Sequence, residues 1–188
     1  YTTIDNTYML ENFEHSSNLN IKEMNLSNRY DLKSYFPYIK DNLNLKNHKL
    51  NIEFKKNFFS LKGNGQIFIQ KESDDIKYNI TNSKDIIKFN TLVDIKKNPF
   101  NLDFLNFKKN KNSNLSISFN GNKNLSSEGL FIKNIDIKEK GNHLEVINLI
   151  LSKNYKIKKI DQIDLDYFDK DSIKNKISIL RNNKDYNF

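Results

Sequence analysis

The chain has 188 residues, enough for one domain that buries a hydrophobic core, and a formal net charge of +8 at pH 7. It has no cysteine, which excludes a disulfide framework and a thiolate zinc site, and no apolar run near the roughly 18 residues that cross a bilayer as a helix. Three residue types dominate, with 32 Asn, 29 Lys and 23 Ile against two Arg and no Ala.

The positive charge has two interpretations. A polyanion partner, either nucleic acid or an anionic membrane surface, would explain it. So would an AT-rich genome, because Asn, Lys and Ile have AT-rich codons. Arginine is preferred for phosphate and base contacts, yet only Arg29 and Arg181 are present. The lysines are interleaved with acidic residues, so we do not expect them to gather on one face. We therefore favour the second interpretation and expect no nucleic-acid partner.

Residues 1–42 are expected to form a loosely structured N-terminal segment. The pattern around Leu19 indicates a short edge strand whose partner lies outside the chain. Residues 29–43 predict one short helix. Pro37 would end this helix at Phe36, because proline has no N–H to continue the helical hydrogen bonds.

Residues 43–188 predict an antiparallel sheet, because segments of alternating apolar and polar residues recur about every ten to fifteen residues. Successive side chains of a strand point to opposite faces, so each segment has one apolar and one polar face. No long pattern of 3.6-residue period separates the segments, which argues against βαβ units. We predict an all-β fold: an elongated, antiparallel, curled and groove-like sheet of repeated strands, with at most one or two short helices. We expect it to be a fragment of a longer, repeat-built protein.

The glycines at positions 63 and 65 leave one local question open. Asn-Gly between alternating segments is a strong hairpin signal. However, Leu61 and Ile67 have the same parity on the two sides of the glycines. One long strand with a glycine bulge therefore fits as well as a hairpin.

The sequence contains no catalytic or metal-binding constellation. The segment 161–171 is rich in Asp, but it lacks the glycine and the final glutamate that a calcium-binding EF-hand loop requires. Asp164 and Asp166 alternate instead with apolar residues, as on the solvated face of a strand. The three histidines are isolated and have no neighbour at a ligand spacing. We therefore expect a protein without enzymatic activity, cofactor or metal.

Four phrases in the chain together resemble one protein family. They are Leu50-Asn-Ile-Glu-Phe54, the segment 59–69, Phe104-Leu-Asn-Phe-Lys-Lys109 and the segment 158–169. Their order is similar to that in the AsmA-like family of bacterial envelope proteins, which are bridge-like lipid-transfer proteins. The resemblance covers residues 43–180 and is carried by strand patterning and not by an invariant motif.

This resemblance implies a large protein anchored to the inner membrane through a segment outside this chain. Its periplasmic body would be a β-sheet curled into an apolar groove that conducts phospholipids between the inner and outer membranes. The implied partners are a phospholipid or other acyl-chain ligand and further repeats of the same chain, with membrane contact through parts outside it. The family has no catalytic residues to carry over.

The candidate groove residues are the apolar side chains of one parity. They are Phe59, Leu61, Ile67, Ile69, Phe89, Val93, Ile95, Leu115, Ile117, Phe119, Ile147, Leu149, Ile163 and Leu165. Burial of acyl chains needs no polar group, since each buried CH₂ contributes about 0.8 kcal/mol. Two alternatives remain: a Lys-rich polyanion-binding module, which requires lysines clustered on one face, and a purely structural β-rich surface protein, which requires a closed, dry core.

Overall fold

A computed structural model of the chain describes residues 14–28, 32–102, 107–109, 113–127, 129–168, 172–182 and 185–187. Residues 1–13 of the expected N-terminal segment and residues 29–31 of the expected helix therefore lie outside the described residues.

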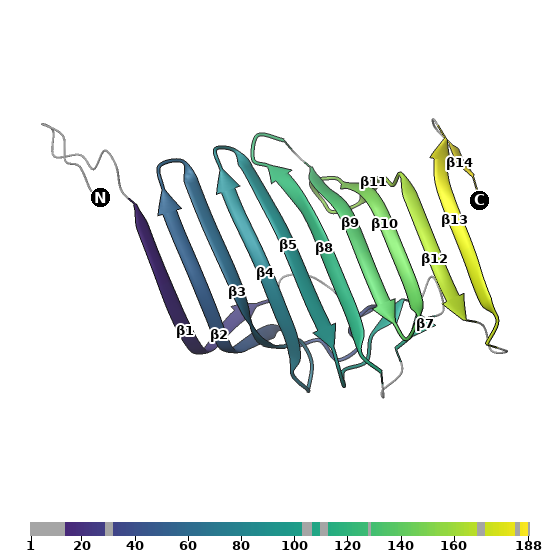
Figure 1. The fold of residues 1–188 in the computed structure, drawn as a ribbon, viewed down its shortest axis with the longest axis horizontal. Helices are drawn as coiled ribbons and strands as arrows, with labels where there is room; N and C mark the ends of the chain where they lie inside the picture. Colours follow the sequence, from purple (N-terminus) through teal and green to yellow (C-terminus); the bar gives the residue numbers. More distant parts are fainter. Residues whose placement is uncertain are drawn as a thin grey trace, which may run out of the picture.

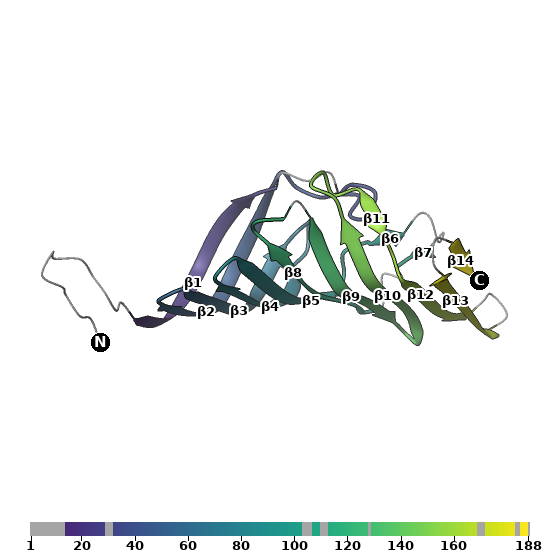
Figure 2. The ribbon, with the colours of Figure 1, turned by 90° about the horizontal axis from the view of Figure 1, so that it is seen from above.

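The described residues form one large antiparallel sheet and a small two-stranded one (Figure 1). The large sheet has twelve strands, in the order β1-β2-β3-β4-β5-β8-β9-β10-β12-β13-β14, with β11 also paired to β10. The strand bounds are β1 His15–Ser27, β2 Asn42–Lys55, β3 Phe58–Phe68, β4 Asp74–Ser83, β5 Ile86–Ile95, β6 Asn101–Leu102, β7 Phe107–Lys108, β8 Leu115–Asn124, β9 Leu130–Glu139, β10 Asn142–Leu151, β11 Ile157–Lys159, β12 Gln162–Phe168, β13 Lys174–Asn182 and β14 Asp185–Asn187. The predicted all-β, antiparallel class is confirmed. Viewed from above, the sheet runs from β1 at one end to β13 and β14 at the other (Figure 2).

The N-terminal part departs from expectation in two ways. β1 pairs along its whole length with β2, from His15 opposite Phe54 to Ser27 opposite Asn42, so its partner lies within the chain. The described part of 29–43 contains turns and no helix. The amides of residues 35 and 36 both donate to the Leu32 carbonyl, and the next residue, Pro37, has no N–H to extend this single turn.

The glycine-containing segment is one continuous strand. β3 runs through Gly63 and Gly65 without a turn, and the hairpin to β2 lies earlier, at Asn57, whose φ is 60°. The irregularity in this pair is in β2, where Asn47 has φ 52° and the register shifts. A turn accepts Asn in this left-handed conformation more readily than most residues.

The strand registers divide the large sheet into an apolar and a polar face. Residues directly opposite each other on neighbouring strands share a face, so they form rows across the sheet. One row of the apolar face is aliphatic over seven strands: Ile76, Val93, Ile117, Ile137, Leu144, Leu165 and Ile177. Amides dominate a row of the polar face: Asn18, Asn51, Lys62, Asn79, Asn90, Asn120 and Asn134.

Two connecting segments cover one end of the apolar face. We call residues 32–41 and 96–109 the roof; its described part lies behind the lower end of the strands in Figure 1 and includes β6 and β7. Phe100 and Leu102 of the roof join the core, in which Ile95 and Leu115 are fully buried. The ring of Phe36 meets that of Phe100 edge-on at 5.3 Å, so the two segments also pack on each other.

A buried amide side chain fixes both roof segments to the sheet. Gln70, at the exit of β3, is fully buried. Its Oε1 accepts a hydrogen bond from the Tyr38 amide at 3.0 Å, and its Nε2 donates to the Pro99 carbonyl at 2.8 Å. Because Tyr38 and Pro99 belong to different roof segments, this one side chain ties both of them to β3.

A second buried polar group holds the start of β4 against the roof. The side chain of Asn98 accepts a hydrogen bond from the Glu72 amide at 3.1 Å and donates to the Glu72 carbonyl and to Oδ2 of Asp74, both at 2.7 Å. Asp74 also accepts from the Lys96 amide at 3.1 Å. Burial raises the pKa of Asp74, against the opposing effect of these hydrogen bonds and of Lys109.

Replacing Gln70 by methionine, of similar size, should lower the free energy of unfolding by about 2–5 kcal/mol, because the Tyr38 amide and the Pro99 carbonyl lose their buried partner. Urea denaturation measures this. The control is Gln66→Met on the same strand, where the side chain accepts one 3.3 Å hydrogen bond from Asn47 at the surface; its effect should stay within about 0.5 kcal/mol. Equal effects of the two changes would contradict the role given to Gln70.

Asp74 should also make stability depend on pH. Its folded pKa lies above the ordinary value of 3.8, so between these two values the folded state holds a proton that the unfolded state has lost. The stabilising contribution of protonated Asp74 is complete below 3.8 and is lost as the pH rises through the folded pKa. The difference in unfolding free energy between the wild type and Asp74→Asn should therefore fall over this window. A difference that rises with pH would mean that the folded pKa is lowered.

Candidate functional site

Part of the apolar face extends beyond the roof. Here a row of apolar residues crosses four strands, with Ile52 opposite Leu61, Leu61 opposite Ile80, and Ile80 opposite Phe89. The Phe89 ring lies 6.1 Å from that of Phe119, measured between ring centroids. We call this surface the open apolar patch; its residues are Ile52, Phe54, Phe59, Leu61, Ile80, Phe89 and Phe119. Phe54 is 46% exposed and the others are half-buried.

The structure divides thirteen of the fourteen candidate groove residues into four groups. Phe59, Leu61, Phe89 and Phe119 belong to the open apolar patch, and Leu149 is buried outside the core cluster. Five are in the core beneath the roof: Ile67, Ile69, Val93, Ile95 and Leu115. Three are partly buried and pack against that core: Ile117, Ile163 and Leu165.

The fourteenth candidate, Ile147, lies with the polar row. It is opposite Asn134 on β9 and Gln162 on β12. The next residue, Asn148, has φ 54°, and Leu149 after it pairs with Ile132 of the apolar face. The simple alternation of side chains therefore fails at Asn148, and parity alone assigned Ile147 to the wrong face.

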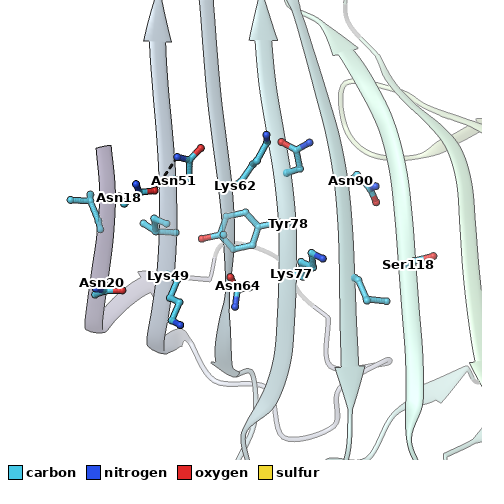
Figure 3. Close-up of a pocket in the computed structure, with 15 residues that line it drawn as sticks. Asn18, Asn20, Lys49, Asn51, Lys62, Asn64, Lys77, Tyr78, Asn90 and Ser118 are labelled. Carbon is cyan, nitrogen blue, oxygen red and sulfur yellow. Dashed lines mark hydrogen bonds between the residues drawn. The ribbon is translucent and has the colours of Figure 1, made fainter. Parts of the chain in front are cut away.

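The polar face is hollowed over its first half. A hollow of about 810 Å³ is lined by residues of β1 to β5 and β8, including Asn18, Lys62, Asn90 and Ser118 (Figure 3). A Lys-x-Asn pattern recurs in the strands beneath it: 49–51 in β2, 62–64 in β3 and 77–79 in β4. In each case the middle residue belongs to the apolar face and the other two to the polar face.

Antiparallel pairing turns this repeated pattern into a checkerboard. Because neighbouring strands run in opposite directions, Asn64 lies between Lys49 and Lys77 in one row. In the adjacent row, Lys62 lies between Asn51 and Asn79. We call these six residues the Lys–Asn block. No lysine of the block is directly opposite another, which avoids the destabilising effect of facing like charges.

The block has polar groups that are not used within the described part of the chain. Lys49, Lys62 and Lys77 are exposed and form no ion pair with another described residue. Asn64 and Asn79 are exposed as well, and Asn51 donates a 3.0 Å hydrogen bond to Asn18 at the rim. The three ammonium groups and two of the amides therefore face solvent in the hollow.

The row that contains Lys49 and Lys77 becomes acidic on the later strands. It continues through Asp136, Glu145 and Asp164. These carboxylates have partners within the sheet: Asp136 is 3.1 Å from His143 Nε2, Glu145 accepts from Asn134 at 2.7 Å, and Asp164 accepts from Gln162 and Ser178, both at 2.5 Å. The described residues contain no group of three or more His, Asp or Glu side chains that could hold a metal ion. They also contain no helix that is long and apolar enough to cross a membrane.

The gathering of these lysines corrects one expectation from sequence. The lysines were expected not to collect on one face, because acidic residues are interleaved with them along the chain. In the sheet, the acidic residues near the block lie in other rows, and Asp75, for example, pairs with Lys96 at 2.6 Å. The signal that could have located the block is the repetition of Lys-x-Asn in successive strands.

No protein-family model, no curated protein and no solved structure matches this chain. Its class is therefore defined by its fold: an all-β protein built on one wide antiparallel sheet, with a roof over one end of the apolar face and a hollow on the polar face.

Position 63 should accept only glycine because the Tyr78 ring occupies the space that a side chain would need. A Cβ at Gly63 would collide with the Tyr78 ring, which lies over the glycine on the apolar face. Gly63→Ala should lower the free energy of unfolding by about 1–3 kcal/mol through this overpacking. In the Tyr78→Val background, Gly63→Ala should change the free energy of unfolding little. A double-mutant cycle measured by urea denaturation checks this. Equal costs in both backgrounds would show that the ring is not the cause.

Proposed function

We propose that the apolar face binds acyl chains of phospholipids and that the protein is a non-enzymatic, lipid-binding part of a bacterial envelope protein. The observation that carries the proposal is the open apolar patch: phenylalanine, leucine and isoleucine side chains lie side by side on five strands, next to the core beneath the roof. Such a surface favours a ligand without directional bonding groups, because burial of apolar area alone supplies the binding free energy.

The breadth of the apolar face supports an extended hydrocarbon ligand. Its aliphatic row runs without a charged residue from Ile76 on β4 to Ile177 on β13. Strands are about 4.8 Å apart, so seven strands extend this row over roughly 29 Å. Curling of the sheet around such a ligand, and passage of phospholipid between inner and outer membranes from a periplasmic, membrane-anchored body, belong to the same proposal.

The experiment is native mass spectrometry with lipid extraction on the protein purified from bacterial membranes. Leu61→Gln together with Ile80→Gln adds polar groups to the open apolar patch. This change should reduce co-purified phospholipid about tenfold or more, since losing contact with two methylenes costs about 1.6 kcal/mol.

The matched control places the same residue type on the other face. Thr81→Gln together with Asn122→Gln changes two positions of one polar row, Thr81 and Asn122 both lying opposite Lys88. It should leave the bound lipid unchanged. A stably folded, lipid-free wild type, or an equal loss of lipid in the control, would reject the proposal.

A further inference from the structure

We propose that the Lys–Asn block binds an acidic oligosaccharide. The site lies on the face opposite the open apolar patch, so it is independent of the proposed acyl-chain binding. It lies in the hollow lined by residues of β1 to β5 and β8.

The chemistry of the block suits a ligand with both carboxylates and hydroxyls. A lysine ammonium group has three donors and no acceptor, so it pairs with an anionic oxygen. An asparagine amide has a carbonyl acceptor and an NH₂ donor, so it can both accept from and donate to a hydroxyl. Lys49, Asn64 and Lys77 alternate along one row, so groups that can bind a carboxylate alternate with a group that can bind a hydroxyl.

The spacing of the block suits a chain with acidic groups at regular intervals. Adjacent positions in a row are about 4.8 Å apart, so Lys49 and Lys77 are roughly 10 Å apart at the backbone. Lys62 lies between them in the neighbouring row. An extended acidic oligosaccharide laid across the strands therefore meets an ammonium group on each of three successive strands.

The same surface fits nucleic acid less well. Single strands are bound by stacking of bases on exposed aromatic rings, and bases are read by arginine. Among the described residues that line the hollow, the one aromatic is Tyr78, whose ring packs over Gly63 on the other face. None of the lining residues is an arginine.

The test is isothermal titration calorimetry with tetragalacturonate at low salt. In the block variant Lys49→Gln, Lys62→Gln and Lys77→Gln, the affinity should fall about ten- to a hundredfold, because each exposed ion pair contributes up to about a factor of five. The matched control removes three exposed lysines from turns, with Lys56→Gln, Lys84→Gln and Lys140→Gln. This control variant has the same net charge as the block variant, and its affinity for tetragalacturonate should fall less than about twofold. An equal loss in both variants, or no binding by the wild type, overturns the proposal.

A second comparison tests hydroxyl recognition. A polyacrylate of four carboxylates has the same charge as tetragalacturonate but no hydroxyls, so it should bind more weakly. Asn64→Val with Asn79→Val removes the donors and acceptors of both amides, so it should weaken binding of tetragalacturonate and leave that of polyacrylate unchanged. Polyacrylate, a short oligonucleotide or anionic phospholipid vesicles binding as tightly as tetragalacturonate would show a general cationic surface and reject the oligosaccharide. Circular dichroism melting of every variant separates loss of binding from loss of folding.

Discussion

The main physical constraint on this structure is that its wide sheet has an apolar face, whereas only two short segments of the chain are available to cover that face. Two short segments cover one end of that face, and each needs buried partners for its backbone groups, because an unpaired buried amide or carbonyl costs as much as a lost hydrogen bond. Gln70 meets this need for both segments at once, through Tyr38 and Pro99. The core forms where these segments lie, and Ile95 and Leu115 beneath them are fully buried. The other end of the face, with Leu61 and Phe89, stays partly exposed because the roof segments do not cover it.

The strand pattern of the sheet was predictable because it is local. Alternation of apolar and polar residues marks strands such as β5 and β8 directly, and the all-β antiparallel class follows from the short spacing between strands. The register irregularities were not predictable, because they depend on neighbouring strands. In the sequence, Gly63 and Gly65 fit a turn as well as a strand. The structure explains glycine in a continuous strand, because a Cβ at these positions would collide with the rings of Tyr78 and His48.

The candidate sites were predictable to different degrees. Four residues of the open apolar patch, Phe59, Leu61, Phe89 and Phe119, were predicted from parity, and the other three were not among the candidates. Parity also does not show which candidates the roof covers, since 96–102 is remote in sequence from β2 and β3. Ile147 was assigned to the wrong face because a single left-handed residue, Asn148, shifts the alternation. The Lys–Asn block was missed because codon bias explains abundant Lys and Asn, and abundance says nothing about register.

Register separates a compositional bias from an organised surface. A bias places Lys and Asn on any solvated position, and β5 continues the pattern with Lys88 and Asn90. There, however, Asn90 faces Asn79 and Lys88 faces Thr81, so the alternation of the block ends at β4. The row beyond it passes through Leu92 and Ser118 before turning acidic. The alternation is thus confined to three adjacent strands within the hollow, and composition alone would not confine it there.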